Sequence, residues 1–330
     1  MNNDNYYEII QKYYKYFFNR IPDESGFKHY SDLFKSGELD EQKFIKICEN
    51  SEEYKRIQEW KENKKKNKPY IFQGKFELFY KIRPANALDL HITKKGIYHD
   101  WIPFKLKNLI PENGIIFDIG ANAGLLSLPF AKNYVPNGNV YSFEPNSKVR
   151  NHFLENIKLN NLKNIVVEPI VLQENSKIRK ILFYNRTVYF ESLENDTMHS
   201  LYSDFSNEGN EYVESSTLDN YVSEKNIPNI NLIKIHVMGA DSRVLEGGKS
   251  TINEFQPIII YKHGQRFEYE TGIHDSERCF DFMKKNGFKQ YPIFESDLGK
   301  EIFEFEPFNK SNVNILCLGS NHATDFFNNY

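Results

Sequence analysis

An acidic residue and two glycines near the middle of the chain have the types and spacing of a small-ligand site. Asp118 follows an apolar run at 115–117, and Gly120 and Gly124 come shortly after it. A carboxylate near the end of a buried strand reaches the edge of a sheet, and glycines let the backbone turn sharply and approach a ligand closely. Free N–H groups at the start of a following helix then meet the electron-rich end of that ligand. This stretch favours the binding of a small charged cofactor.

Glu144 narrows the choice of cofactor. It ends the apolar run 140–143, about 20 residues beyond the glycine turn, where an acid can bind ribose hydroxyls. A dinucleotide site uses Gly-x-Gly-x-x-Gly to crowd a pyrophosphate, but the middle glycine is absent here and Asp118 precedes the turn. S-adenosylmethionine carries no phosphate, and its ribose matches Glu144 while its ammonium matches Asp118, directly or through water. The residues therefore favour S-adenosylmethionine over a dinucleotide.

A parallel sheet must position these residues. Apolar runs at 115–119, 140–143 and 165–168 alternate with helical segments within about 55 residues, which indicates right-handed strand–helix–strand crossovers. A long helical segment is expected at about 242–252. Further apolar runs predict later strands at 230–237, 257–261, 288–292, 302–305 and 313–318.

Several ordered motifs resemble those of the FkbM-type S-adenosylmethionine-dependent methyltransferases. They are Phe-Asp-Ile-Gly-Ala-Asn-Ala-Gly at 117–124, Val-Tyr-Ser-Phe-Glu-Pro-Asn at 140–146, Ser-Thr-Leu-Asp at 216–219, Asn-Leu-Ile-Lys-Ile from 231 and Val-Leu-Glu-Gly-Gly from 244. The resemblance covers roughly residues 90–320. It implies an α/β fold, a Rossmann-like seven-stranded class I methyltransferase sheet, and methyl transfer to a hydroxyl, often on a sugar or natural product. Carried over by position, it implies that the cofactor is lined by Asp118, Gly120, Ala121, Asn122, Gly124 and Glu144, with Asp219 near the cofactor or substrate mouth as a catalytic candidate.

Two segments depart from the pattern of that family. After Ile235 the family usually shows Asp-Val-Glu-Gly-x-Glu, whereas residues 236–241 here read His-Val-Met-Gly-Ala-Asp. The strand at 257–261 is commonly followed by a glutamate, and Lys262 and His263 stand in its place. These changes remove negative charge from neighbouring strand ends. We expect no divalent metal, because hard cations need oxygen ligands that these segments no longer supply.

Three hypotheses follow from the departures. In the first, His236 is the general base for a hydroxyl, since an ordinary imidazole titrates near neutral pH. In the second, His236, Lys262 and His263 form a cationic pocket for an acidic substrate such as a uronate or phosphorylated sugar. In the third, the protein binds without turnover, as a catalytically silent binding or scaffolding protein. Methyl transfer needs positioning more than acid–base power, so we favour an active O-methyltransferase. The family resemblance implies that its acceptor is a hydroxyl of a carbohydrate or glycan precursor.

Residues 1–66 are predicted to form a small all-α N-terminal domain, followed by the methyltransferase domain at 67–330. Apolar residues recur at helical spacing over 6–18, and the basic segment 61–69 predicts a linker. The module resembles a helical companion of secreted and glycan-modifying enzymes, through Asn19, Arg20, Pro22, Asp23, Gly26, Tyr30, Ser51 and Tyr54. We predict that these residues chiefly build turns and caps. A protein partner or self-association through the module is left open.

Composition narrows the class of protein. A formal net charge of −3 gives no general attraction to nucleic acid or to an anionic membrane. Cys48, Cys279 and Cys317 are too far apart for a disulfide framework or a paired zinc motif. The start of the chain lacks a basic region followed by an apolar one, and no apolar run reaches about 18 residues. We expect a cytoplasmic protein with a small-molecule or saccharide substrate, no nucleic-acid partner and no integral membrane segment.

Overall fold

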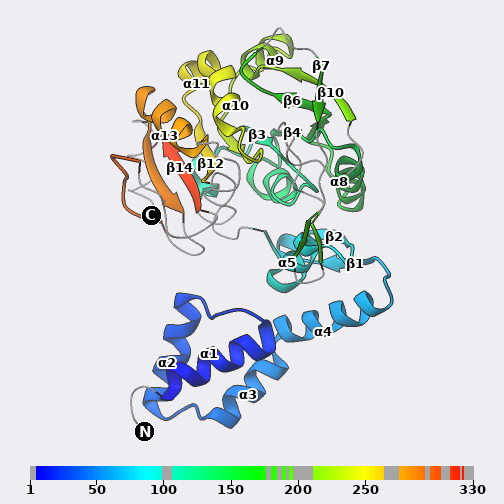
Figure 1. Cartoon of the computed structure of the whole chain (residues 1–330), viewed down its shortest axis with the longest axis vertical. Helices are drawn as coiled ribbons and strands as arrows, with labels where there is room; N and C mark the ends of the chain where they lie inside the picture. The colour runs from blue at the N-terminus through cyan, green and yellow to red at the C-terminus, as the bar shows by residue number, and fades with distance from the viewer. Residues whose placement is uncertain are drawn as a thin grey trace. The chain divides into compact units, whose positions relative to one another are not determined.

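The computed structural model describes residues 5–98, 106–175, 180–183, 188–190, 193–195, 211–263, 275–293, 298–305, 313–319 and 322 (Figure 1). The chain forms two compact units. The first comprises Met1–Lys75 and Lys81–Tyr98, and the second comprises Phe76–Tyr80 and His99–Tyr330. The boundary predicted between residues 66 and 67 therefore falls inside the first unit.

The first unit begins with four helices, so the predicted helical N-terminal region is present. They are α1 (Asn5–Phe18), α2 (Glu24–Ser36), α3 (Glu41–Asn50) and α4 (Glu52–Lys65). Their core consists of buried apolar side chains, namely Ile10, Tyr14, Phe17, Phe18, Leu39, Phe44, Cys48 and Ile57. Beyond α4 the unit also contains β1 (Tyr70–Gln73) and α5 (Ala87–Lys95), whereas η1 (Lys75–Glu77) and β2 (Phe79–Ile82) are each divided between the two units. Because α5 packs against α4, the unit continues past residue 66.

The polar motif residues of this unit build turns and helix caps. Asp23 caps α2 and Ser51 caps α4, each accepting the N–H of the residue three positions ahead, at 2.8 and 3.2 Å. The Arg20 guanidinium binds the Glu53 carboxylate through two bonds of 2.8 and 2.7 Å and lies over the Tyr14 ring. These contacts join the end of α1 to α4, which matches the predicted structural role.

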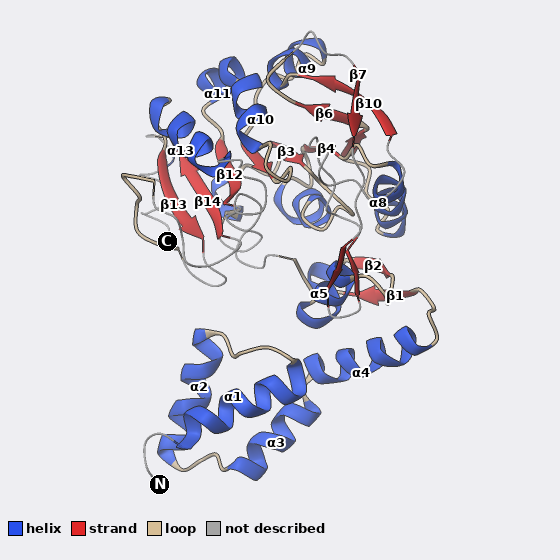
Figure 2. Ribbon diagram, in the orientation of Figure 1, coloured by secondary structure: helices blue, strands red, loops and turns tan. Residues whose placement is uncertain are grey.

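The second unit is built on a seven-stranded sheet with the order β13-β14-β12-β11-β3-β4-β5 (Figure 2). Its strands are β3 (Ile115–Ile119), β4 (Asn139–Phe143), β5 (Ile165–Glu168), β11 (Leu232–Ile235), β12 (Ile258–His263), β13 (Lys289–Ile293) and β14 (Val313–Leu318). All run parallel except β14, which is antiparallel to both of its neighbours. This confirms the predicted Rossmann-like seven-stranded sheet.

Helices cover both faces of this sheet (Figure 2). On one face, α9 (Leu218–Glu224), α10 (Asp241–Gly247), α11 (Lys249–Phe255) and α13 (Asp275–Lys285) pack on apolar strand residues such as Phe117, Ile233 and Ile259. Successive strand residues point to opposite faces, so Asp118 points the other way. There it meets α7 (Ser127–Pro129), which continues into η3 (Phe130–Tyr134); α8 (Ser147–Leu159) follows β4.

Smaller elements are η2 (Lys107–Leu109), a sheet of β6 (Ile170–Leu172), β10 (Glu211–Ser216) and β7 (Lys180–Phe183), and the pair β8 (Val188–Phe190) and β9 (Leu193–Asn195).

Two predicted elements were wrong in detail. The strand predicted at 302–305 is not part of the sheet; Ile302 only donates one backbone bond of 2.9 Å to the Gln290 carbonyl. The helix predicted at about 242–252 is divided into α10 and α11 at Gly248. A Cβ on the preceding Gly247 would lie 2.1 Å from the carbonyl oxygen of Gln173, so tertiary packing demands a glycine here.

Candidate functional site

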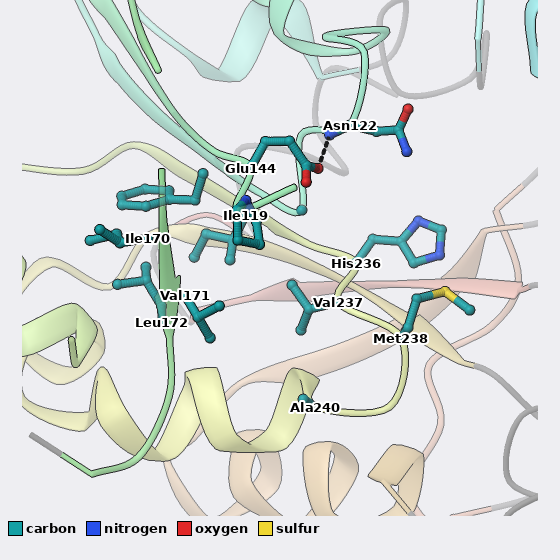
Figure 3. A pocket seen from close by; sticks show the side chains of 13 residues that line it. Ile119, Asn122, Glu144, Ile170, Val171, Leu172, His236, Val237, Met238 and Ala240 are labelled. Atoms are coloured by element: carbon teal, nitrogen blue, oxygen red, sulfur yellow. Dashed lines mark hydrogen bonds between the residues drawn. The ribbon is translucent and has the colours of Figure 1, made fainter. Parts of the chain in front are cut away.

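A cavity opens at the carboxyl ends of β3, β4 and β11 (Figure 3). Chain order along the sheet reverses beside β3, and parallel α/β sheets bind ligands at such a switch point. The space within the cavity, including the part open to solvent, is about 620 Å³. The turn after β3, the end of β4, the loop 236–240 and strand β6 line it.

The turn after β3 is pressed against its neighbours. The N–H groups of Gly120 and Ala121 both donate to the Phe143 carbonyl at 3.0 Å. Gly120 has φ +77°, and a Cβ there would lie 2.1 Å from the His236 carbonyl oxygen. Gly124 has φ +80°, and its Cβ would lie 2.0 Å from the Phe153 ring. The glycines thus allow the turn to approach β11 and α8. Gly120 lines the cavity, whereas Gly124 and Ala121 are not among its lining residues.

Glu144 and Asn122 meet at the cavity wall. The Glu144 carboxylate accepts the N–H groups of Asn122 and Asn146, both at 2.9 Å, and Figure 3 shows the first of these bonds. Glu144 is 6 % exposed, and its burial raises the pKa of the carboxyl group to about 7 against the opposing effect of the two N–H donors. The structure therefore brings together Glu144, at the end of β4, and Asn122, in the turn after β3, both of which were predicted to line the cofactor site.

Asp118 lies beneath the turn, outside the cavity lining. It is completely buried, with Oδ1 3.0 Å from Nζ of Lys234 and Oδ2 accepting a 2.5 Å bond from the Ser127 hydroxyl. This corrects the expected contact with a cofactor ammonium, because Lys234 already supplies the cation. Lys234 had no predicted role. The sequence feature that could have revealed its role is its position as the single lysine within the apolar strand Leu232–Ile235, because a buried charge requires a partner.

The loop after β11 brings His236 and Met238 to the cavity. Met238 and Gly239 in this loop have φ +52° and +83°. A hydrogen bond of 3.3 Å from the Val237 N–H to the buried Asp241 carboxylate fixes the loop to the start of α10. Burial and the nearby Asp275 raise the pKa of Asp241. Figure 3 shows His236 with Asn122 and Met238 among the residues that line the cavity. His236 is thus the predicted basic residue that lines the cavity.

Lys262 and His263 do not join His236 in this cavity. They are successive residues of β12, so their side chains point to opposite faces of the sheet. His263 is 1 % exposed and its ring packs 5.6 Å from that of Phe305. Burial, followed by the charge of Lys234, lowers the pKa of Lys262 to about 8. The predicted cationic pocket of three side chains is therefore corrected to His236 alone.

Asp219 also has a different place from the one predicted. It lies in the first turn of α9, and its carboxylate accepts the N–H groups of Ser250 and Thr251 at 3.1 and 2.8 Å. These bonds satisfy free donors at the start of α11. Asp219 does not line the cavity, so its contacts are those of a helix-capping residue.

The described residues form neither a cluster of metal ligands nor a membrane-spanning helix. Among the described residues, no three His, Cys, Asp or Glu side chains gather as metal ligands. Within the same part of the chain, every helix is too short or too polar to cross a bilayer.

Comparisons with known proteins identify the family. The model of the methyltransferase FkbM domain matches residues 118–290, more than half of the chain. "Methyltransferase 1" from Beauveria bassiana is 26% identical over 179 residues, which cover 50% of this chain and 69% of that protein. This assignment favours an enzyme over the catalytically silent alternative.

Solved structures of methyltransferases are also similar. The methyltransferase FkbM of Methylobacillus flagellatus has a TM-score of 0.38 and 13% identity, with 64% of this chain and 46% of that chain covered. M. jannaschii TYW2 in complex with AdoMet has a TM-score of 0.37 and 14% identity, covering 76% and 84%. This chain thus spans less than half of the Methylobacillus protein. The family match, rather than these structural likenesses, carries the assignment: the chain belongs to the FkbM methyltransferase domain family and is a methyltransferase.

Proposed function

We propose that this methyltransferase uses S-adenosylmethionine to methylate a hydroxyl of a carbohydrate or glycan precursor. The observation that supports this choice of cofactor is the position of the Glu144 carboxylate at the wall of a cavity whose described lining contains no lysine or arginine. A carboxylate is an acceptor for ribose hydroxyls, and the turn after β3 lacks the middle glycine that lets the pyrophosphate of a dinucleotide approach the backbone. The cofactor that fits has a ribose and no phosphate.

The residues present fit S-adenosylmethionine. Glu144 would accept the ribose hydroxyls, and its bonds to two backbone N–H groups fix the direction of its oxygens. Phe143, Ile170 and Leu172 supply apolar surface for the adenine. When bound, the cofactor supplies an electrophilic methyl group on a sulfonium. Asp118 would act from beneath the turn rather than by contact.

The acceptor favoured by this lining is a neutral hydroxyl. Lys262 and His263 lie outside the described lining, so they do not favour the acidic substrate considered from the sequence. His236 lines the cavity and would take the proton from the acceptor hydroxyl as its oxygen attacks the methyl group. That the hydroxyl belongs to a carbohydrate or glycan precursor follows from the family resemblance alone.

Glu144→Gln should weaken S-adenosylmethionine binding about tenfold to a hundredfold, because a hydrogen bond to a charged group contributes about 1.5–3 kcal/mol. The hydroxyl donates to the ionised carboxylate, so protonation competes with binding. With a pKa of about 7 for Glu144, wild-type affinity should fall as the pH drops below 7, and the variant should lose this dependence. Calorimetric titrations between about pH 6 and 8 measure both effects. Glu224→Gln, an exposed residue of α9, is the control; an unchanged affinity in Glu144→Gln would reject the ribose contact.

His236→Ala should lower the turnover number about 10²- to 10⁴-fold, the usual contribution of a general base, while S-adenosylmethionine affinity stays near that of the wild type. Transfer of a labelled methyl group to a neutral sugar that the wild-type enzyme accepts measures the rate. His29→Ala, an exposed residue of the first unit, is the matched control. A wild-type rate in His236→Ala would remove this residue from catalysis.

A further inference from the structure

We propose that Lys234 is a positioning residue of the cofactor site, acting through the carbonyl of Gly120. Its ammonium holds the turn after β3 in the shape that points the Asn122 N–H at Glu144. The effect on cofactor affinity rests on the proposed function, whereas the effect on Glu144 itself does not.

The ammonium of Lys234 joins two groups beneath the turn. Lys234 is 7 % exposed, and its Nζ lies 3.0 Å from Oδ1 of Asp118 and donates to the Gly120 carbonyl at 2.9 Å. The strand register places Lys234 directly beside Asp118, so both side chains point to the same face. Lys234 does not line the cavity and therefore has no direct route to a ligand there.

The turn is held from two sides. On the β4 side, backbone N–H groups of Gly120 and Ala121 donate to the Phe143 carbonyl. On the β11 side, the bond from Lys234 is made by a side chain, so it can be removed by mutation without altering the backbone. Asn122 follows two residues after Gly120, and its N–H donates to Glu144 at 2.9 Å. A shift of the Gly120 peptide therefore moves the donor that orients the Glu144 carboxylate.

Charge provides a second link between Lys234 and Glu144. Burial raises the pKa of Glu144, and the charge of Lys234, like that of Arg150, opposes this rise. Loss of the ammonium removes that opposition, and loss of a well-aimed Asn122 N–H acts in the same direction, because both stabilise the ionised carboxylate. A residue that only filled space at position 234 would leave the titration of Glu144 unchanged.

The experiment compares the wild type, Lys234→Met, and the double variant Lys234→Met/Asp118→Asn. The single variant leaves the Asp118 carboxylate buried without its cation, which endangers folding; the double variant removes both charges and keeps the shapes. Carbon-13 NMR of the labelled glutamates, with the Glu144 signal assigned by Glu144→Gln, reports the pKa of Glu144. Calorimetric titration with S-adenosylmethionine reports affinity, and Lys163→Met, which removes an exposed lysine, is the control.

The pKa of Glu144 should be higher than in the wild type in both folded Lys234 variants, and S-adenosylmethionine should bind about tenfold more weakly. The rise should be smaller in the double variant, because loss of the Asp118 charge acts in the opposite direction. Lys163→Met should change neither quantity. An unchanged Glu144 titration in the folded double variant overturns the proposal, whatever happens to affinity. If the wild type binds no S-adenosylmethionine but the Glu144 titration still moves, the proposed cofactor fails and the positioning role of Lys234 stands.

Discussion

Gly120→Ala should lower the free energy of unfolding by about 3–5 kcal/mol, whereas Gly287→Ala should lower it by only about 1–2 kcal/mol. Both glycines have a left-handed backbone, with φ +77° and +81°, so both substitutions carry the same conformational cost. They differ in the space around the added methyl group. A Cβ at Gly120 would lie 2.1 Å from the His236 carbonyl oxygen, whereas nothing lies within 4 Å of one at Gly287.

Urea unfolding of the two variants measures this difference, through the transition midpoint at constant slope. Gly287→Ala is the matched control, because it isolates the backbone cost from the collision. Gly120→Ala should also weaken cofactor binding in the protein that remains folded, since Gly120 carries the turn toward Glu144. Equal losses of stability in the two variants would contradict the close approach of the turn to the loop after β11.

Asp118→Ala should lower the free energy of unfolding by about 3–5 kcal/mol, because it leaves the Lys234 ammonium buried without a counter-charge. The substitution also removes the acceptor of the Ser127 hydroxyl, which in turn accepts a 2.9 Å bond from Ser142. Loss of both charges together is different, since neutral groups of similar shape carry a smaller desolvation cost than an unpaired buried charge. The variant Asp118→Asn/Lys234→Met should therefore be more stable than Asp118→Ala.

An exposed ion pair is the control for this prediction. Arg243 and Glu174 are separated by 2.6 Å, closer than Asp118 and Lys234, but their side chains are 27% and 34% exposed. Water screens such a pair, so Glu174→Ala should lower the free energy of unfolding by no more than about 1 kcal/mol. Denaturant unfolding of all three variants under one set of conditions shows whether the burial of an ion pair or the distance between its charges determines the loss of stability. A loss in Asp118→Ala no larger than that in Glu174→Ala would contradict the buried charge pair.

The fold was predictable where local pattern and tertiary structure agree. Strands β3 and β5 lie where the sequence predicted them, because short apolar runs in a parallel sheet have clear ends. The strand predicted at 302–305 failed because alternation shows only that a strand has an apolar face, not that a neighbour offers it hydrogen bonds. The division between α10 and α11 falls at Gly248, next to Gly247, whose close approach to the Gln173 carbonyl is a contact that no local pattern contains.

The site was predictable to the extent that it follows from strand ends. Asn122 and Glu144 meet because the carboxyl ends of neighbouring parallel strands share one edge of the sheet. The Lys234 contact with Gly120 joins residues 114 positions apart, and sequence spacing does not show which strand pairs with which. Alternation along β12 does separate Lys262 from His263, and it is a local rule that argues against placing both in one pocket.

Calorimetric titration of the intact wild-type chain with S-adenosylmethionine, beside a titration with NAD, tests most directly that this cavity binds a ribose-containing cofactor without phosphates. S-adenosylmethionine should bind at one site per chain and lose affinity in Glu144→Gln, while NAD should show no binding that depends on Glu144. No heat of binding at millimolar S-adenosylmethionine, or a Glu144-dependent affinity for NAD, would contradict it.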